Sequence, residues 1–200
     1  MVFAFVRFIT YGPIRALRNV SLALLLANPA SAATIAALGD SLTQGYGLAP
    51  EEGFVPQLQA WLAAQGQTVT IQNAGVSGDT SAGGLARLDW TLAPDVQGLI
   101  VTLGANDMLR GIDPAQTRAN LDAILLGAKA KNIPVLLIGM QAASNYGPDY
   151  KAQFDAIYPD LAARYKVLLA PSFFAPLVAK SPDPAALTQY LQPDGLHPNA

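Results

Sequence analysis

Thr34-Ile-Ala-Ala-Leu38 is a short apolar run that leads directly into the polar block Gly39-Asp-Ser-Leu-Thr43. Four more apolar runs follow along the chain: Val69-Thr-Ile-Gln72, Leu99-Ile-Val-Thr-Leu103, Ile133-Pro-Val-Leu-Leu-Ile138 and Lys166-Val-Leu-Leu169. Their hydrophobicity is nearly continuous rather than alternating, which is typical of parallel strands that helices cover on both faces. The pattern therefore predicts a sheet of five parallel strands.

Stretches of helical length separate these runs, at about residues 53–65, 81–91, 114–131 and 149–165. Asp113-Pro114 marks the start of the third stretch, because Asp is a common N-cap residue and Pro is favoured at the first helical position. Strand and helix alternate from residue 33 onward without repeats or low-complexity linkers. This alternation predicts an α/β fold, a flavodoxin-like three-layer α/β/α sandwich.

Polar residues gather where the predicted strands end. The first three strands lead into Gly39-Asp-Ser-Leu-Thr43, Asn73-Ala-Gly-Val-Ser-Gly-Asp-Thr80 and Gly104-Ala-Asn-Asp107, and Asp194-Gly-Leu-His197 lies near the end of the chain. The carboxyl ends of parallel strands meet at one edge of a sheet, where ligands of open α/β proteins bind. A hydroxyl, backbone amides, a carboxamide, a carboxylate and an imidazole would converge there. This set of groups suits acyl transfer through a serine nucleophile.

The composition excludes several other kinds of protein. The chain of 200 residues is 52% hydrophobic and 13% charged, which excludes a disordered protein. A formal net charge of −2 offers no basic surface for nucleic acid. Cysteine is absent and histidine occurs once, which excludes a disulfide framework, an iron–sulfur cluster and a Cys/His zinc site. We therefore expect neither a metal nor a cofactor.

Residues 1–32 are predicted to be a secretory signal peptide. Arg7, Arg15 and Arg18 precede the apolar stretch Val20-Ser-Leu-Ala-Leu-Leu-Leu-Ala27, and Ala30-x-Ala32 provides a small-residue cleavage site. This apolar stretch is far shorter than the roughly 20 residues that span a bilayer, which argues against an uncleaved anchor. We expect cleavage after Ala32 and a periplasmic or secreted protein without a stable membrane anchor.

Four blocks carry a resemblance to a known family. They are Gly39-Asp-Ser-Leu-Thr43, Ser77-Gly-Asp-Thr80, Gly104-Ala-Asn-Asp107 and Asp194-x-x-His197, and they resemble, in order, the four blocks of the SGNH (GDSL) hydrolases. The stretches 78–88, 145–150 and 156–159 are similar to those of the bacterial periplasmic arylesterase, thioesterase I and lysophospholipase L1 group. The resemblance covers nearly all of residues 34–200. It implies a serine esterase that hydrolyses carboxylic esters, and also acyl thioesters or lysophospholipids, through an acyl-enzyme.

The resemblance implies a role for each block. Ser41 would be the nucleophile, His197 the general base and Asp194 the acid that orients the base. The backbone N–H groups of Ser41 and Gly78 and the side-chain amide of Asn106 would form the oxyanion hole. The chemistry agrees, because a serine hydroxyl needs an adjacent base and His197 is the single imidazole of the chain. An Asp three residues before the His can fold back onto its Nδ1.

Neighbouring residues are expected to support the site. An apolar wall for an acyl chain or an aryl group is predicted from four loop residues, with ordinary loop packing as the alternative: Met108, Leu109, Ile112 and Tyr146. Asp40 and Asp107 are expected to brace the loops, since Asp commonly bonds nearby backbone.

Other interpretations stay open at this point. Ser41 is also a suitable cap for the helix or turn after the first strand, and Gly78 and Asn106 suit turns. A secreted, non-catalytic ligand-binding protein on a hydrolase-like scaffold is the alternative function. An α/β-hydrolase is disfavoured, because the chain has no G-x-S-x-G elbow and the predicted acid lies three residues before the His.

The end of the chain departs from the family pattern. The family continues after the His-Pro-Asn block with an amphipathic helix, whereas this chain ends at Ala200. Without that helix we expect an exposed apolar patch on the sheet sandwich. We also expect His197 to lie on a fraying end that is too loose to hold hydrogen-bond geometry to Ser41.

Overall fold

The sheet consists of parallel strands at the places that the apolar runs predict. The computed structural model describes residues 32–181 and 183–200, so nearly all of the predicted signal peptide lies outside the described residues. The strands are β1 (Ala33–Gly39), β2 (Val69–Gly75), β3 (Val96–Thr102), β4 (Val135–Ile138) and β5 (Leu168–Ala170). They pair in the order β2-β1-β3-β4-β5, and every neighbouring pair is parallel. This is the flavodoxin-like order, so the predicted fold is confirmed.

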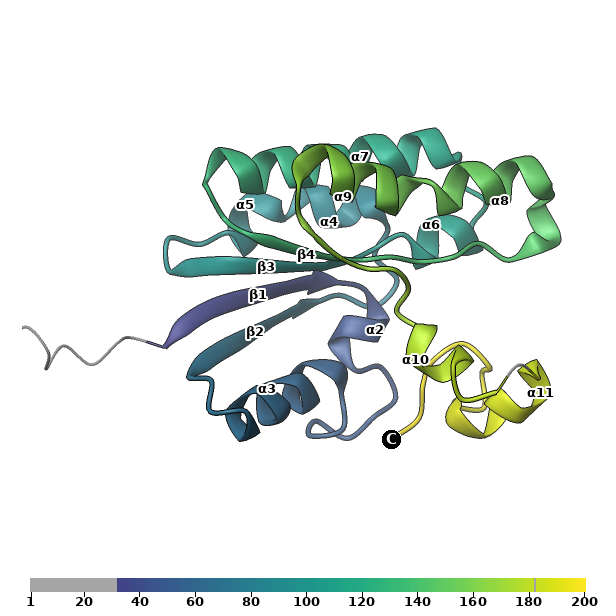
Figure 1. The fold of residues 1–200 in the computed structure, drawn as a ribbon, viewed down its shortest axis with the longest axis horizontal. Helices are drawn as coiled ribbons and strands as arrows, with labels where there is room; N and C mark the ends of the chain where they lie inside the picture. Colours follow the sequence, from purple (N-terminus) through teal and green to yellow (C-terminus); the bar gives the residue numbers. More distant parts are fainter. Residues whose placement is uncertain (1–31, 182) are drawn as a thin grey trace, which may run out of the picture. The chain divides into compact units, whose positions relative to one another are not determined.

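Helices cover both faces of the sheet (Figure 1). On one face lie α4 (Ser81–Ala86), α5 (Leu88–Thr91), α7 (Pro114–Ala130), α8 (Pro148–Asp155) and α9 (Ile157–Tyr165), and on the other lies α3 (Phe54–Ala64). Short helices and 3-10 turns follow the strand ends or belong to the C-terminal part: α2 (Ser41–Gln44), α6 (Ala105–Leu109), η1 (Ser144–Tyr146), α10 (Ala175–Val178), α11 (Pro184–Leu187) and η2 (Thr188–Tyr190). In the part of the chain that the structure describes, no helix has the length and apolar character needed to cross a membrane.

Two of the predicted helical stretches are each divided into two helices. The stretch 149–165 is divided into α8 and α9 at Ala156. Pro159 explains the break, because proline lacks the N–H that would donate to the carbonyl of Asp155 and its ring crowds that carbonyl. The stretch 81–91 is likewise divided, at Arg87.

Two hydrophobic cores lie on opposite faces of the sheet. Leu38 and Val101 belong to the larger core beneath α7 and α9, whereas their chain neighbours Ala37 and Ile100 belong to the smaller core beside α3. Successive residues of a strand point to opposite faces, and here both faces are covered. Coverage on both faces is the reason why the strands read as continuous apolar runs.

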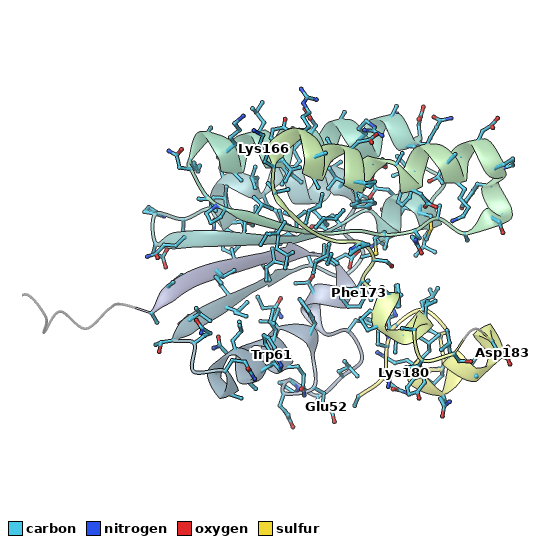
Figure 2. All side chains as sticks on the ribbon, in the orientation of Figure 1. Glu52, Trp61, Lys166, Phe173, Lys180 and Asp183 are labelled. Atoms are coloured by element: carbon cyan, nitrogen blue, oxygen red, sulfur yellow. The ribbon has the colours of Figure 1, made fainter. Side chains whose placement is uncertain are left out.

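An apolar groove of about 690 Å³ lies between α3 and the strands β3, β4 and β5. Trp61, on α3, and Leu168, on β5, line this groove and are 59% and 73% exposed. Figure 2 labels Trp61 on the face that α3 covers. The groove is an exposed apolar surface, and its relation to the helix that the family pattern adds stays a prediction.

Arg87 ties together the ends of two strands. Its guanidinium donates to the carbonyl oxygens of Gly39, at the end of β1, and Ala74, in β2, at 2.8 and 2.6 Å. Its Nε donates to the carboxylate of Asp79 at 2.7 Å. One partly buried side chain thus fixes the carboxyl ends of β1 and β2 against the loop that begins α4.

Candidate active site

Ser41, His197 and Asp194 form a continuous hydrogen-bonded series. Ser41 is the first residue of α2, directly after β1, and is 8% exposed. The Nε2 atom of His197 lies 2.8 Å from the Oγ of Ser41, and its Nδ1 lies 2.6 Å from Oδ2 of Asp194. In this arrangement an imidazole can remove the hydroxyl proton while a carboxylate fixes the tautomer of the ring. The structure therefore brings the three predicted residues together.

The helix cap after β1 is Asp40 rather than Ser41. Oδ1 of Asp40 accepts the N–H of Leu42 at 3.0 Å, which is an N-cap bond to α2. The Ser41 hydroxyl faces His197 instead. The capping interpretation of Ser41 is thus not what the structure shows.

A tight turn positions Asp194 against His197. Oδ1 of Asp194 accepts the N–H groups of Leu196 and His197 at 2.9 and 3.1 Å, and Gly195 has a φ of +69°, which favours glycine. The bond from the Leu196 N–H, together with those from His197, lowers the pKa of Asp194 to about 2. At neutral pH this carboxylate is ionised and available to orient the imidazole.

The C-terminal segment holds His197 in place, so the expectation of a fraying, loosely held histidine is wrong. Leu191 and Pro198 form an antiparallel bridge, and the N–H of Gln192 donates to the His197 carbonyl at 2.7 Å. The side-chain amide of Gln192 donates to the carbonyl of Tyr46 at 2.8 Å. These bonds attach the segment to itself and to the loop after α2, and they supply the anchor that the sequence did not show.

Two of the residues predicted to form the oxyanion hole, Gly78 and Asn106, lie just after the ends of β2 and β3. Gly78 has a φ of +81°, a conformation that L side chains rarely adopt, and its carbonyl accepts from Nη2 of Arg110 at 2.7 Å. Asn106 lies in the first turn of α6, and its Nδ2 donates to Oδ2 of Asp40 at 3.3 Å. Because Arg110 caps α6, the Gly78 loop and the Asn106 turn are linked to each other and to the residue before Ser41.

Asp40 and Asp107 brace the site, as predicted. Asp40 is fully buried, and burial raises its pKa to about 6 although the bonds from Leu42 and Asn106 favour the ionised form. Asp107 accepts the N–H of Ser81 at 2.7 Å, the Ser81 hydroxyl, and the hydroxyl of Thr117 at 3.1 Å. It therefore connects α6 to α4 and α7.

Three of the four predicted apolar residues, Met108, Leu109 and Ile112, follow β3, and Tyr146 lies in η1 after β4 and contacts Leu109. The hydroxyl of Tyr146 donates to the carbonyl of Leu109 at 3.1 Å, and the two side chains are 41% and 48% exposed. Met108 packs partly buried against the larger core, and the carbonyl of Ile112 accepts from Tyr150 at 3.0 Å. The structure thus gathers these residues beside Asn106, and their contact with substrate stays a prediction.

A second apolar surface beside Ser41 was not predicted. A cavity of about 240 Å³ contains Ser41 and His197 and is lined by Tyr46, Phe54 and Phe173, among others. Figure 2 shows Phe173 near α10 and Glu52 on the loop that leads into α3. Two signals were available in the sequence: Tyr46 follows Ser41 closely, and Phe173 follows the end of the fifth apolar run.

The described residues hold no cluster of three or more His, Cys, Asp or Glu side chains that would bind a metal ion. The chemistry that this arrangement offers is acid–base and nucleophilic: a hydroxyl, an imidazole, an ionised carboxylate and amide donors at one edge of the sheet.

Comparison with known proteins places the chain among esterases. The model of the family described as GDSL-like Lipase/Acylhydrolase matches residues 37–200. Esterase TesA of Pseudomonas aeruginosa is 41% identical over 176 residues, which cover 88% of this chain and 84% of that protein. Thioesterase 1/protease 1/lysophospholipase L1 of Escherichia coli is 40% identical over 180 residues, which cover 89% of this chain and 81% of that protein.

A solved structure shows the same fold. The crystal structure of AlinE4, described as an SGNH-hydrolase family esterase, has a TM-score of 0.75 and is 42% identical. The match covers 84% of this chain and 87% of that one.

Because the pKa of the buried Asp40 is raised, we expect part of the free energy of unfolding to depend on pH. Its pKa rises from 3.8 to about 6 on folding, so the folded protein binds this proton more tightly than the unfolded chain does. The stability that this proton confers is complete below pH 3.8 and is lost as pH rises through about 6. For Asp40→Asn, we expect the difference in free energy of unfolding from the parent protein to change by about 2 to 3 kcal/mol between pH 4 and pH 7.

Urea unfolding at a series of pH values measures this difference. Asp194→Asn is the control of opposite sign, because the pKa of Asp194 is lowered to about 2 and its contribution is present above pH 3.8 and lost as pH falls toward 2. Equal slopes for the parent and Asp40→Asn between pH 4 and pH 6 would show that burial does not perturb Asp40.

Proposed function

The chain belongs to the GDSL-like lipase/acylhydrolase family, and we propose that it hydrolyses carboxylic esters through an acyl-enzyme formed on Ser41. The observation that carries the proposal is the series from Asp194 to His197 to Ser41, with contacts of 2.6 and 2.8 Å. These distances lie within the reach that proton transfer between a nucleophile and its base requires.

In the proposed first step, Oγ of Ser41 attacks the ester carbonyl carbon while Nε2 of His197 takes the hydroxyl proton. Asp194, whose pKa is lowered to about 2, stays ionised and stabilises the imidazolium that forms. His197 then donates the proton to the leaving oxygen. A water molecule activated by the same imidazole would release the acid and restore Ser41.

Asn106, Gly78 and Ser41 are the proposed oxyanion donors. The negative charge on the carbonyl oxygen appears only as the tetrahedral intermediate forms, and preorganised N–H groups stabilise it without reorganisation. Asp40 supports this function, because its carboxylate holds the amide of Asn106 at 3.3 Å and caps the helix that begins with Ser41. Asp40 thus acts on the reaction through its neighbours.

The proposed substrates are small-molecule acyl or aryl esters, with acyl thioesters and lysophospholipids as further candidates. All of these present a carbonyl to the same donors, so discrimination depends on the surfaces beside Ser41. We propose that Met108, Leu109, Ile112 and Tyr146 contact the acyl part. The names of the relatives, which include esterase, thioesterase and lysophospholipase, support this range.

Replacement of the nucleophile or the base tests the proposal directly. Ser41→Ala and His197→Ala should each lower kcat for a p-nitrophenyl ester by about 10⁴-fold or more, because neither partner can transfer the proton alone. Ser144→Ala, an exposed serine in η1, is the matched control and should keep full activity. Substantial hydrolysis by Ser41→Ala would refute the assignment.

Replacement of Asn106 tests whether its side-chain amide acts in catalysis or in substrate binding. Asn106→Ala should lower kcat by roughly 10²- to 10³-fold with little change in KM, since the amide acts on charge that develops in the transition state. Steady-state kinetics on one ester measures both constants. A variant that is altered only in KM would assign Asn106 to substrate binding instead.

We further propose that the mature protein is exported and begins at or near Ala33. The charged, apolar and small-residue segments before Ala33 support this proposal. Expressed with its own N-terminus in a bacterium, the protein should be recovered outside the cytoplasm, and N-terminal sequencing should read from Ala33. Ala32→Tyr, which places a bulky residue at the cleavage site, should slow processing. A cytoplasmic product that retains Met1 would contradict export.

A further inference from the structure

Gly78, one of the proposed oxyanion donors, belongs to a tight turn. The N–H of Asp79 donates to the carbonyl of Val76 at 3.1 Å, which closes a four-residue turn over residues 76–79. Gly78 is the third residue of this turn, and its φ of +81° is the value that a type II turn requires there. In a type I turn the peptide before this residue is rotated by roughly half a circle, so its N–H points the other way. The glycine therefore sets the direction of the Gly78 N–H relative to the turn.

The Gly78 N–H has no acceptor within the protein, whereas its neighbours are paired. In the part of the chain that the structure describes, the other N–H groups of residues 75–79 all donate to oxygen atoms of the protein, at 2.9 to 3.1 Å. The Gly78 N–H takes part in none of the hydrogen bonds among the described residues. A backbone N–H without a partner is costly unless water or a ligand accepts from it. This N–H is therefore available to an oxygen atom of a substrate.

Two side chains hold this turn. Oε1 of Gln44, the last residue of α2, accepts the N–H of Ser77 at 3.0 Å. Nη2 of Arg110, which caps α6, donates to the carbonyl of Gly78 at 2.7 Å. The peptide that carries the Gly78 N–H joins Ser77 to Gly78. The two side chains thus fix the peptides directly before and directly after it.

We propose that Gln44 and Arg110 are positioning residues of the oxyanion hole. They fix the Gly78 N–H relative to the other two donors, the N–H of Ser41 and the side-chain amide of Asn106. Ser41 begins α2 and Asn106 lies in α6, so each side chain joins the turn to the helix of another donor. This proposal rests on the proposed function of Ser41.

A third bond completes the connection between the donors. The amide of Asn106 donates to Asp40, the N-cap of α2, at 3.3 Å, and so joins α6 to α2. The turn, α2 and α6 are therefore linked to one another in pairs. Oxyanion donors act at about 2.7–3.1 Å from the oxyanion, and a misplacement of about 1 Å can cost roughly 10²-fold in rate. Bonds that fix the distances between the donors should therefore raise kcat.

Loss of the Arg110 bond should affect the chemical step rather than substrate binding. For Arg110→Ala we expect kcat for the neutral ester p-nitrophenyl acetate to fall by about tenfold with little change in KM, because one hydrogen bond that holds a donor is lost while the donor itself remains. Arg118→Ala removes an arginine of α7 that pairs with Asp160 and is the matched control with parent constants. A change in KM alone, or a loss confined to anionic esters, would make Arg110 a substrate ligand and overturn the proposal.

Exchange of the carbonyl oxygen for sulfur gives a readout that a general loss of folding would not move. The thiono ester of the same acid and leaving group places sulfur where the oxyanion would form, and sulfur is a weak hydrogen-bond acceptor. The ratio of kcat/KM for p-nitrophenyl acetate to that for its thiono ester should fall by about fivefold in Arg110→Ala, because the oxygen ester depends more on the donors. Arg118→Ala should keep the parent ratio. An equal loss for both esters would overturn the proposal.

The second bond has its own variant. Gln44→Met keeps the length of the side chain but lacks the amide oxygen, so we expect kcat to fall by about threefold and the ratio of oxygen to thiono ester to fall with it. Gln57→Met, at an exposed glutamine of α3, is the matched control. Parent-like constants in either variant would overturn the role of that residue.

Failure of the proposed function is distinguishable, because hydrolysis would then persist in Ser41→Ala. If Arg110→Ala does not fold, the comparison of Gln44→Met with Gln57→Met still decides whether the turn needs to be held.

Discussion

The buried carboxylate of Asp40 is the point at which the parts of the site meet. It accepts the N–H of Leu42, which sets the start of α2 and hence the place of Ser41, and it accepts the amide of Asn106 from α6. A carboxylate without such donors would be costly at a fully buried position. The raised pKa of about 6 shows that burial still outweighs the two bonds. The protein thus accepts a destabilising charge where the nucleophile and an oxyanion donor must be held together.

Backbone packing at the strand ends gives Asp40 its fixed surroundings. A Cβ at Gly75 would collide with the backbone of Gln44, so this glycine lets α2 lie directly on the end of β2. Arg87 donates hydrogen bonds to the carbonyls of Gly39 and Ala74. Because its planar guanidinium bonds three groups at once, a lysine at position 87 would not reproduce this connection. The glycine and the arginine together convert the ends of two strands into a rigid support for Ser41.

Much of this arrangement could be predicted from the sequence, and the rest depends on contacts between distant segments. Continuous apolar runs revealed the sheet because both faces are covered. The roles of Ser41, Asp194 and His197 came from the resemblance of their blocks to the SGNH (GDSL) hydrolases, with which the need of a serine hydroxyl for an adjacent base agrees. The firm hold on His197 could not be predicted, since it depends on the long-range bond from Gln192 to Tyr46. The cavity beside Ser41 was missed for the same reason: Tyr46 and Phe173 lie far apart in the sequence, and only the tertiary fold brings them to one surface.

The surfaces on the two sides of Ser41 are built by different segments of the chain. Substrate specificity can therefore change on one side without a change on the other. The predicted acyl side consists of α6 and the loop that contains Tyr146, where Tyr146 and Leu109 are bonded to each other. The other side is the cavity that Ser41 and His197 line, and it consists of the loop after α2, the start of α3 and the segments after β5, where Gln192 connects the C-terminal part to Tyr46. Substitutions on one side leave the bonds of the other intact, so their effects on substrate selectivity should combine additively where the residues share no partner. The catalytic series lies between the two sides and is held by its own bonds to α2 and to the Asp194 turn. Loop changes on either side can therefore alter the substrate range while the chemistry at Ser41 stays the same.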